Sequence, residues 1–191
     1  MNEPQVDERV QRWADEAWPL RFKRHLFSAR CWNVQRCSVI YDNHEQGTTD
    51  PYAVETVFRS AGEPPSPDWK DDWRGNYVIF PGYHGGNAFP KEPVKLDWTA
   101  LDGSAHLATV DLDALFKDRL VLHNVEREDI PVGWLAAKTD DPVVVDILLE
   151  VNDRTVNVYC KAHVTTNEEQ IPGNPRSHHR RDLILAWTHI Y

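Results

Sequence analysis

The chain has 191 residues and a net charge of −9, because 21 Lys and Arg stand against 30 Asp and Glu. An acidic protein repels phosphate groups, so nucleic acid and anionic membranes are poor partners, and no apolar run approaches the roughly 20 residues needed for membrane insertion. The length fits a single domain that spans residues 1–191.

The first predicted element is an amphipathic helix over residues 7–18, which Pro19 ends. Its apolar residues recur at the helical i, i+3, i+4, i+7 spacing, and they are Val10, Trp13, Ala14 and Ala17. The sequence before the helix is charged and has no apolar signal segment, which predicts a cytoplasmic protein, or a periplasmic one if a signal sequence has been removed. Residues 26–191 are predicted to form a β-rich body.

Two hairpins are predicted in the first part of this body. Residues 26–43 contain two β-prone runs on either side of residues 33–36. Further along, Asp102-Gly103 is a favoured hairpin turn, and it joins strands predicted at residues 94–99 and 105–110. Both segments therefore predict antiparallel pairs of neighbouring strands.

Shorter elements are predicted after the second hairpin. Asp111 is the expected cap of a short helix over residues 112–118. A further strand is expected at residues 120–125, and a terminal strand at residues 183–191.

The clearest pattern lies in residues 141–166, which predict a long β-hairpin with its turn at residues 152–154. The inward set is Val145, Ile147, Leu149, Val151, Val156, Val158, Cys160, Ala162 and Val164. The outward set is Asp146, Glu150, Thr155, Asn157, Tyr159, Lys161 and His163, with Leu148 as an apolar exception. One face is therefore predicted to be buried and the other to face water, which is typical of an antiparallel sheet packed on one side.

The order of these elements predicts the fold class. Strands recur with turn signals between them and without a βαβ rhythm. The expected fold is mainly β: an antiparallel β-sandwich or a strongly bent sheet with an N-terminal amphipathic helix. Three cysteines are too few for a disulfide scaffold, and Cys31 and Cys37 are either joined across the predicted hairpin or free.

No residue pattern predicts an assembled catalytic group. The sequence has no GxSxG elbow and no HExxH zinc motif, and we expect no cofactor. His84 lies near Asp68, Asp71 and Asp72 in the sequence, a mix of ligand types that binds a metal if the loops converge. A metal-dependent enzyme therefore stays as one alternative.

Two tryptophans support a second alternative. Trp69 and Trp73 lie four residues apart in a polar stretch, and exposed tryptophans on a carbohydrate-binding β-sandwich module stack on sugar rings. The other interpretation is that both rings anchor their loop to the core. The charged N-terminus and the expected free thiols argue against an extracellular sugar binder.

A protein-binding role fits the composition best. Residues 111–153 carry 11 acidic and 4 basic residues, which either keep the protein soluble or meet a basic partner. Tight protein interfaces combine aromatic anchors with a charge-complementary rim. The predicted partner-binding residues are Glu126, Glu128, Asp129, Trp134, Asp140 and Asp141 in an acidic connection, and Trp69, Trp73, Tyr83 and His84 in aromatic loops.

One segment resembles a known group of proteins. Residues 77–98, YVIFPGYHGGNAFPKEPVKLDW, contain a GGNAF glycine turn and then a V-x-L-x-W strand. This segment resembles bacterial domains of unknown function that are encoded beside type VI secretion effectors and are presumed to be immunity proteins. Many of those proteins are lipoproteins, whereas this sequence has no lipobox cysteine.

The resemblance implies an inhibitor with no chemistry of its own, which neutralises a cognate toxin by occluding its active site. An acidic inhibitor suits a basic toxin such as a nuclease, because carboxylates mimic phosphates. An effector that acts on lipid is equally open.

Overall fold

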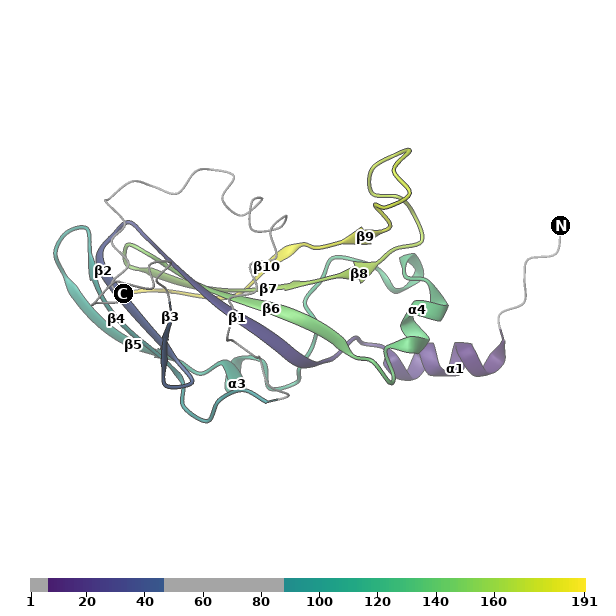
Figure 1. Ribbon diagram of the computed structural model, residues 1–191, viewed down its shortest axis with the longest axis horizontal. Helices are drawn as coiled ribbons and strands as arrows, with labels where there is room; N and C mark the ends of the chain where they lie inside the picture. Colours follow the sequence, from purple (N-terminus) through teal and green to yellow (C-terminus); the bar gives the residue numbers. More distant parts are fainter. Residues whose placement is uncertain (1–6, 47–87) are drawn as a thin grey trace.

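The computed structural model describes residues 7–46 and 88–191 (Figure 1). Two four-stranded sheets share one hydrophobic core, and helix α1 (Glu8–Ala17) lies at one end of the molecule. The fold is mainly β with an N-terminal helix, so the predicted fold class is confirmed. No helix among the described residues is long and apolar enough to cross a membrane.

Helix α1 confirms the helix predicted over residues 7–18. Asp7 caps it by accepting a hydrogen bond from the backbone N–H of Arg9 at 2.8 Å, which satisfies one of the free amides of the first turn. Ala14 is buried in the core, and the helix packs against α4 (Val132–Ala137). The polar remainder of the helix faces solvent, as its amphipathic pattern requires.

The first sheet has the strand order β1–β6–β7–β10. Its strands are β1 (Phe22–Trp32), β6 (Val143–Asn152), β7 (Thr155–Ala162) and β10 (Leu183–Ile190). Strands β6 and β7 form the predicted long hairpin, and β10 is the predicted terminal strand, antiparallel to β7.

Strand β1 departs from the predicted antiparallel arrangement. It runs parallel to β6, from Phe22 opposite Val143 to Trp32 opposite Asn152, with a register shift between Phe22 and Arg24. The expected antiparallel arrangement is therefore wrong for this pair, whereas the other described strand pairs are antiparallel. A parallel neighbour needs a long connection, and period-2 alternation carries no signal of strand direction.

The second sheet has the order β3–β2–β4–β5 and is antiparallel throughout. Its strands are β2 (Val34–Tyr41), β3 (His44–Gln46), β4 (Val94–Ala100) and β5 (Ala105–Val110). The predicted hairpin of β4 and β5 is confirmed. Its turn includes Gly103 at φ +87°, a conformation that glycine adopts without strain.

The hairpin predicted over residues 26–43 is wrong. The two strands exist, but β1 pairs with β6 and β2 pairs with β4, in different sheets. The chain passes from one sheet to the other at Asn33, whose φ is 51°. Both strands bury alternate side chains in the shared core, so their patterns match those of a hairpin although they do not pair.

Short elements connect the sheets. Asp111 caps α3 (Leu112–Leu115) by accepting a hydrogen bond from the N–H of Ala114 at 2.9 Å, as predicted. The strand expected at residues 120–125 is absent from the described structure, where a single bridge joins Arg21 and Leu120. A 3-10 helix, η1 (Arg127–Asp129), precedes α4, and β8 (Val164–Thr165) pairs with β9 (His179–Arg180).

The thiols of Cys31 in β1 and Cys37 in β2 meet at the passage between the sheets. Both are free and buried, as is Cys160. Burial first, and then a hydrogen bond to Cys37, raise the pKa of Cys31 well above its ordinary value. Cys31 is therefore a protonated, unreactive part of the core at neutral pH.

A second polar contact joins the two sheets. His25 in β1 and Tyr41 in β2 are both buried, and His25 Nε2 lies 2.5 Å from Tyr41 Oη in a hydrogen bond. The His25 ring also lies against Phe89, with 4.2 Å between the ring centroids. Burial, followed by the charge of Arg119, lowers the pKa of His25 from 6.5 to about 4.

This shift predicts a pH-dependent stability. The lowered pKa favours the neutral form of His25 in the folded state. The contribution of His25 to stability is therefore fully present above pH 6.5 and is lost as the pH falls through about 4. The free energy of unfolding should fall by up to about 3 kcal/mol over this window. His25→Phe removes this titration, so its free energy of unfolding should fall by about 3 kcal/mol less than that of the wild type over the same window. Urea denaturation at several pH values measures both proteins. His189→Gln, at an exposed position, is the control and should keep the wild-type slope.

Candidate functional site

The predicted acidic connection forms a well-anchored segment, residues 126–141, which we call the acidic segment. It contains η1 and α4 and lies at the α1 end of the molecule (Figure 1). Ile130, Leu135 and Ala136 are buried in the core and fix it to the body of the protein. The charged residues of the segment thus stand on a fixed backbone.

Contacts from elsewhere in the chain also hold the acidic segment. Arg127 forms an ion pair with Asp15 of α1. Asn167, in the loop after β8, donates from its side chain to the carbonyl of Glu128 at 2.9 Å and from its backbone to the carbonyl of Asp129 at 2.7 Å. These contacts reach the segment from both sides and restrict its motion.

All five predicted carboxylates are exposed. Lys138 compensates Asp141, with Nζ 3.1 Å from Oδ2. In the part of the chain that the structure describes, the other four form no ion pair; they are Glu126, Glu128, Asp129 and Asp140. The segment therefore presents a net negative surface to solvent.

Trp134 anchors the acidic segment to the core and does not present an open aromatic face. Its ring is half-buried and packs against the core. Lys138 Nζ lies 5.1 Å from the ring centroid, a cation–π contact. The same lysine forms an ion pair with Asp141, so Trp134 helps to position the charge of Lys138 beside that carboxylate.

A polar pocket of about 230 Å³ adjoins the acidic segment. It is lined by Val125, Asp129, Thr166, Glu168, Gln170 and Arg180. Arg180 is already engaged, since it forms an ion pair with Asp182 at 2.9 Å and donates to the carbonyl of Asn124 at 3.2 Å. Asp129 and Glu168 therefore remain to attract a cationic group, such as a lysine or arginine side chain.

The other four predicted partner-binding residues lie outside the described residues: Trp69, Trp73, Tyr83 and His84. The same holds for the suggested metal ligands of the glycine turn, Asp68, Asp71, Asp72 and His84. Within residues 7–46 and 88–191, no three His, Cys, Asp or Glu side chains are placed to hold a metal ion.

The polar face of the long hairpin differs from its prediction. It was expected to face water, but Leu148 is fully buried and Glu150 and Lys161 are each only 2% exposed. Tyr159 is also buried. Strands β6 and β7 are the two central strands of their sheet and are covered on both faces.

Buried charges on this face are paired with polar groups. Tyr159 Oη donates to Glu150 Oε2 at 3.0 Å, and Asn157 Nδ2 donates to the same oxygen at 2.9 Å. Burial raises the pKa of Asp146 to about 6, although Lys161 and Arg181 act in the opposite direction. Sequence reasoning missed this network. The available signals were Leu148 on the polar side and the cross-strand pair of Asp146 and Lys161.

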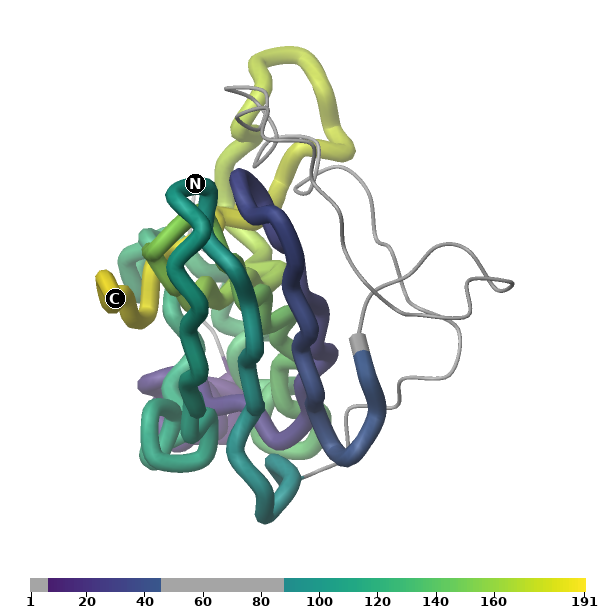
Figure 2. The backbone as a smooth tube through the Cα atoms, turned by 90° about the vertical axis from the view of Figure 1, so that its left-hand side faces the viewer, coloured from purple at the N-terminus to yellow at the C-terminus, as the bar shows by residue number. Residues whose placement is uncertain are grey.

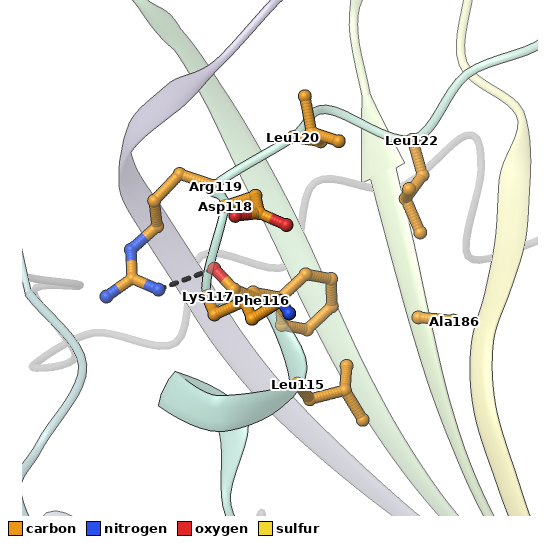
Figure 3. Close-up of a pocket in the computed structure, with 8 residues that line it drawn as sticks. All are labelled: Leu115, Phe116, Lys117, Asp118, Arg119, Leu120, Leu122 and Ala186. Atoms are coloured by element: carbon orange, nitrogen blue, oxygen red, sulfur yellow. Dashed lines mark hydrogen bonds between the residues drawn. The ribbon is translucent and has the colours of Figure 1, made fainter.

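A smaller pocket of about 180 Å³ lies between residues 115–122 and Ala186 of β10 (Figure 3). Its walls include Leu115, Leu120 and Leu122. Arg119 turns away from them and donates to the carbonyl of Phe116 at 2.5 Å. Lys117, Asp118 and Arg119 also line the pocket, and in the described structure no ion pair joins these three side chains, since Arg119 pairs with Asp113.

The Glu150 network predicts a stability effect. Tyr159→Phe removes a donor from a buried carboxylate, which should lower the free energy of unfolding by about 1.5–3 kcal/mol. Thr188→Val is the control, because it removes an exposed 2.6 Å hydrogen bond to Asn157 and should cost less than about 0.5 kcal/mol. Urea denaturation measures both, and equal losses would show that Glu150 does not depend on Tyr159.

A comparison with models of protein families, with curated proteins and with solved structures finds no match to this chain. The resemblance of residues 77–98 therefore remains an expectation from the sequence, and the function rests on the geometry above.

Proposed function

We propose that this protein binds a basic partner protein through the acidic segment, and that it acts as an immunity-type inhibitor of a cognate bacterial toxin. The observation that carries this proposal is the set of four exposed carboxylates without a described cationic partner, Glu126, Glu128, Asp129 and Asp140, on an anchored backbone. The protein inhibits by covering the partner's active site and contributes no chemistry of its own.

Anchoring makes these charges effective in binding. A flexible acidic loop loses conformational entropy when it binds, whereas a segment already held by Arg127 and Asn167 loses less. The net charge of −9 adds long-range attraction to a basic partner and speeds the encounter. Repulsion disfavours acidic proteins as partners for the same reason.

The polar pocket gives the interface a specific contact. We expect one lysine or arginine of the partner to enter it between Asp129 and Glu168. A cation held by two carboxylates in a recess loses more water than one at the rim, so this contact should affect the dissociation rate. The remaining carboxylates then form a rim that guides association.

The direct test begins with an affinity pull-down of the tagged protein from the lysate of its native host, read by mass spectrometry. The proposal expects one stoichiometric partner with a basic surface, whose toxic activity is lost in the complex. Partners that bind without loss of activity would contradict the inhibitor function. An empty pull-down would contradict protein binding itself.

Charge reversal tests the acidic segment once the partner is purified. Glu126→Lys with Glu128→Lys should raise the Kd at least about tenfold and flatten its dependence on salt. Glu92→Lys with Asp118→Lys changes the net charge equally at exposed sites outside the segment and is the matched control. Titration calorimetry at two salt concentrations measures both variants, and equal effects would mean that only net charge matters.

Asp129→Asn tests the pocket by itself, because it removes the charge and nearly keeps the shape. We expect faster dissociation with little change in the association rate, measured by surface plasmon resonance. The matched variant is Asp140→Asn, whose carboxylate is exposed and does not line the pocket. A loss confined to the association rate in both variants would place the pocket outside the interface.

A further inference from the structure

A second recess lies at the other end of the acidic segment. It encloses about 200 Å³, and its lining comes from the last turn of α1, from residues 18–21, from Lys23 of β1 and from residues 138, 139 and 142. Every lining residue belongs to the described part of the chain. Figure 2 is viewed from the opposite end of the molecule, so the recess lies behind both sheets there, at the same end as the acidic segment.

The charge of this recess is opposite to that of the protein. Three cations line it, Arg21, Lys23 and Lys138, against one carboxylate, that of Glu16. The lining thus has a net charge of +2, whereas the whole chain carries −9. We call this recess the cationic pocket, to distinguish it from the polar pocket beside Asp129.

The cations of the cationic pocket are only partly compensated. Arg21 and Lys23 are exposed and form no ion pair within the described residues. Lys138 pairs with Asp141, whose side chain is 85% exposed, and so open an ion pair contributes little to stability. An anionic group that enters the pocket therefore meets positive charge that the described chain does not neutralise.

The fold directs these cations into the recess. Lys23 lies at the register shift of β1 between Phe22 and Arg24, where no residue of β6 is opposite it. An extra residue in one strand of a pair re-aims its side chain, and such bulges are frequent beside functional sites. Arg21 donates from Nη1 to the carbonyl of Asp118, which holds its guanidinium group and leaves further N–H donors for a carboxylate.

The remaining lining suits the stem of one acidic side chain. Trp18 and Leu20 pack against the core, and Pro19 and Pro142 add further apolar lining. Apolar surface accepts the methylene groups of Asp or Glu while the cations hold the carboxylate. The volume of about 200 Å³ is below the roughly 300–1,000 Å³ of cofactor and drug-sized sites, so a single side chain fits better than a larger ligand.

Charge decides which molecule brings this side chain. A free anion is repelled by a protein of charge −9. The acidic segment attracts a basic protein, and an acidic residue on that protein reaches the cationic pocket without this penalty. We propose that the cationic pocket receives an aspartate or glutamate side chain of the basic partner and so fixes the orientation in which that partner lies on the acidic segment. This inference rests on the proposed function and adds a second contact to the same interface.

The two pockets lie at the two ends of the acidic segment, with α4 between them. Asp129 lines the polar pocket, and Lys138 lines the cationic pocket. In the correct orientation a cation of the partner meets Asp129 and a carboxylate of the partner meets Lys138. A partner turned end to end would place like charges together at both pockets, which is costly at an interface. The segment thus selects among basic proteins by the position of one acidic residue.

The first test is the sign of a mutational effect, with the partner purified from the pull-down. Arg21→Gln with Lys23→Gln lowers the net charge from −9 to −11, which would tighten binding if overall attraction alone held the partner. We expect the Kd to rise on the order of tenfold instead, measured by titration calorimetry. Lys23→Gln alone changes an exposed side chain, keeps the fold and should raise the Kd about threefold.

Lys91→Gln with Lys117→Gln is the matched control, because it removes the same charge at exposed sites outside both pockets. Its Kd should stay the same or fall slightly, and circular dichroism should show that every variant is folded. A Kd of the Arg21 and Lys23 variant that falls, or that equals the Kd of this control, overturns the proposal.

Zero-length cross-linking identifies the occupant of the cationic pocket directly. A carbodiimide joins a lysine amine to a carboxylate in contact with it as an amide, and mass spectrometry locates the link. In the complex Lys23 should link to an Asp or Glu of the partner, and Lys23→Arg should lose this link while it keeps the wild-type Kd. Links from Glu126 or Glu128 to lysines of the partner, without any link from Lys23, would support the proposed function and overturn this inference.

A small probe tests the cationic pocket without the partner. In an NMR titration at constant ionic strength, isovalerate should shift the amide signals of residues 16–23 and 138–141, with a Kd on the order of 10 mM. The neutral isovaleramide should leave these signals unchanged, and Lys23→Gln should weaken the response to isovalerate. An equal response to both probes, or no response to either, overturns the proposal whatever the pull-down finds.

Discussion

The parallel pairing of β1 with β6 is the constraint on which the rest of the structure depends. It joins the start of the chain to a segment far along the sequence. Because β1 continues through Asn33 into β2, this pairing also fixes the second sheet relative to the first. The hydrogen bond of His25 with Tyr41 crosses the same join. Neither sheet completes its core face without the other, so we expect them to unfold together.

Local signals in the sequence predicted most strands of the two larger sheets and two helix caps, but also a strand at residues 120–125 that does not form. Alternation of apolar residues identified the β6–β7 hairpin, and Asp7 and Asp111 marked the starts of two helices. The same alternation could not identify the partner of β1. A strand that packs on the shared core buries alternate residues regardless of which strand pairs with it. Nor could it show that Glu150 is buried, since the donors that make its burial tolerable come from the neighbouring strand.

The properties of the acidic segment were also only partly predictable from the sequence. Its charge and exposure were predictable, because clustered carboxylates in an irregular connection seldom become buried. Its rigidity was not, because Asp15 and Asn167 lie far from it in the sequence and meet it only in the folded chain. The pocket beside Asp129 likewise needs Glu168 and Arg180, which β8 and β9 bring into place. Composition thus predicted the charge of the surface, and the fold supplies its shape.

The acidic segment and β5 lie toward opposite ends of the longest axis of the molecule (Figure 1). Under the proposed function, added salt weakens the attraction between the acidic segment and a basic partner, because it screens the charges on both. A contact at β5 lies far enough from the acidic segment to leave that attraction unchanged.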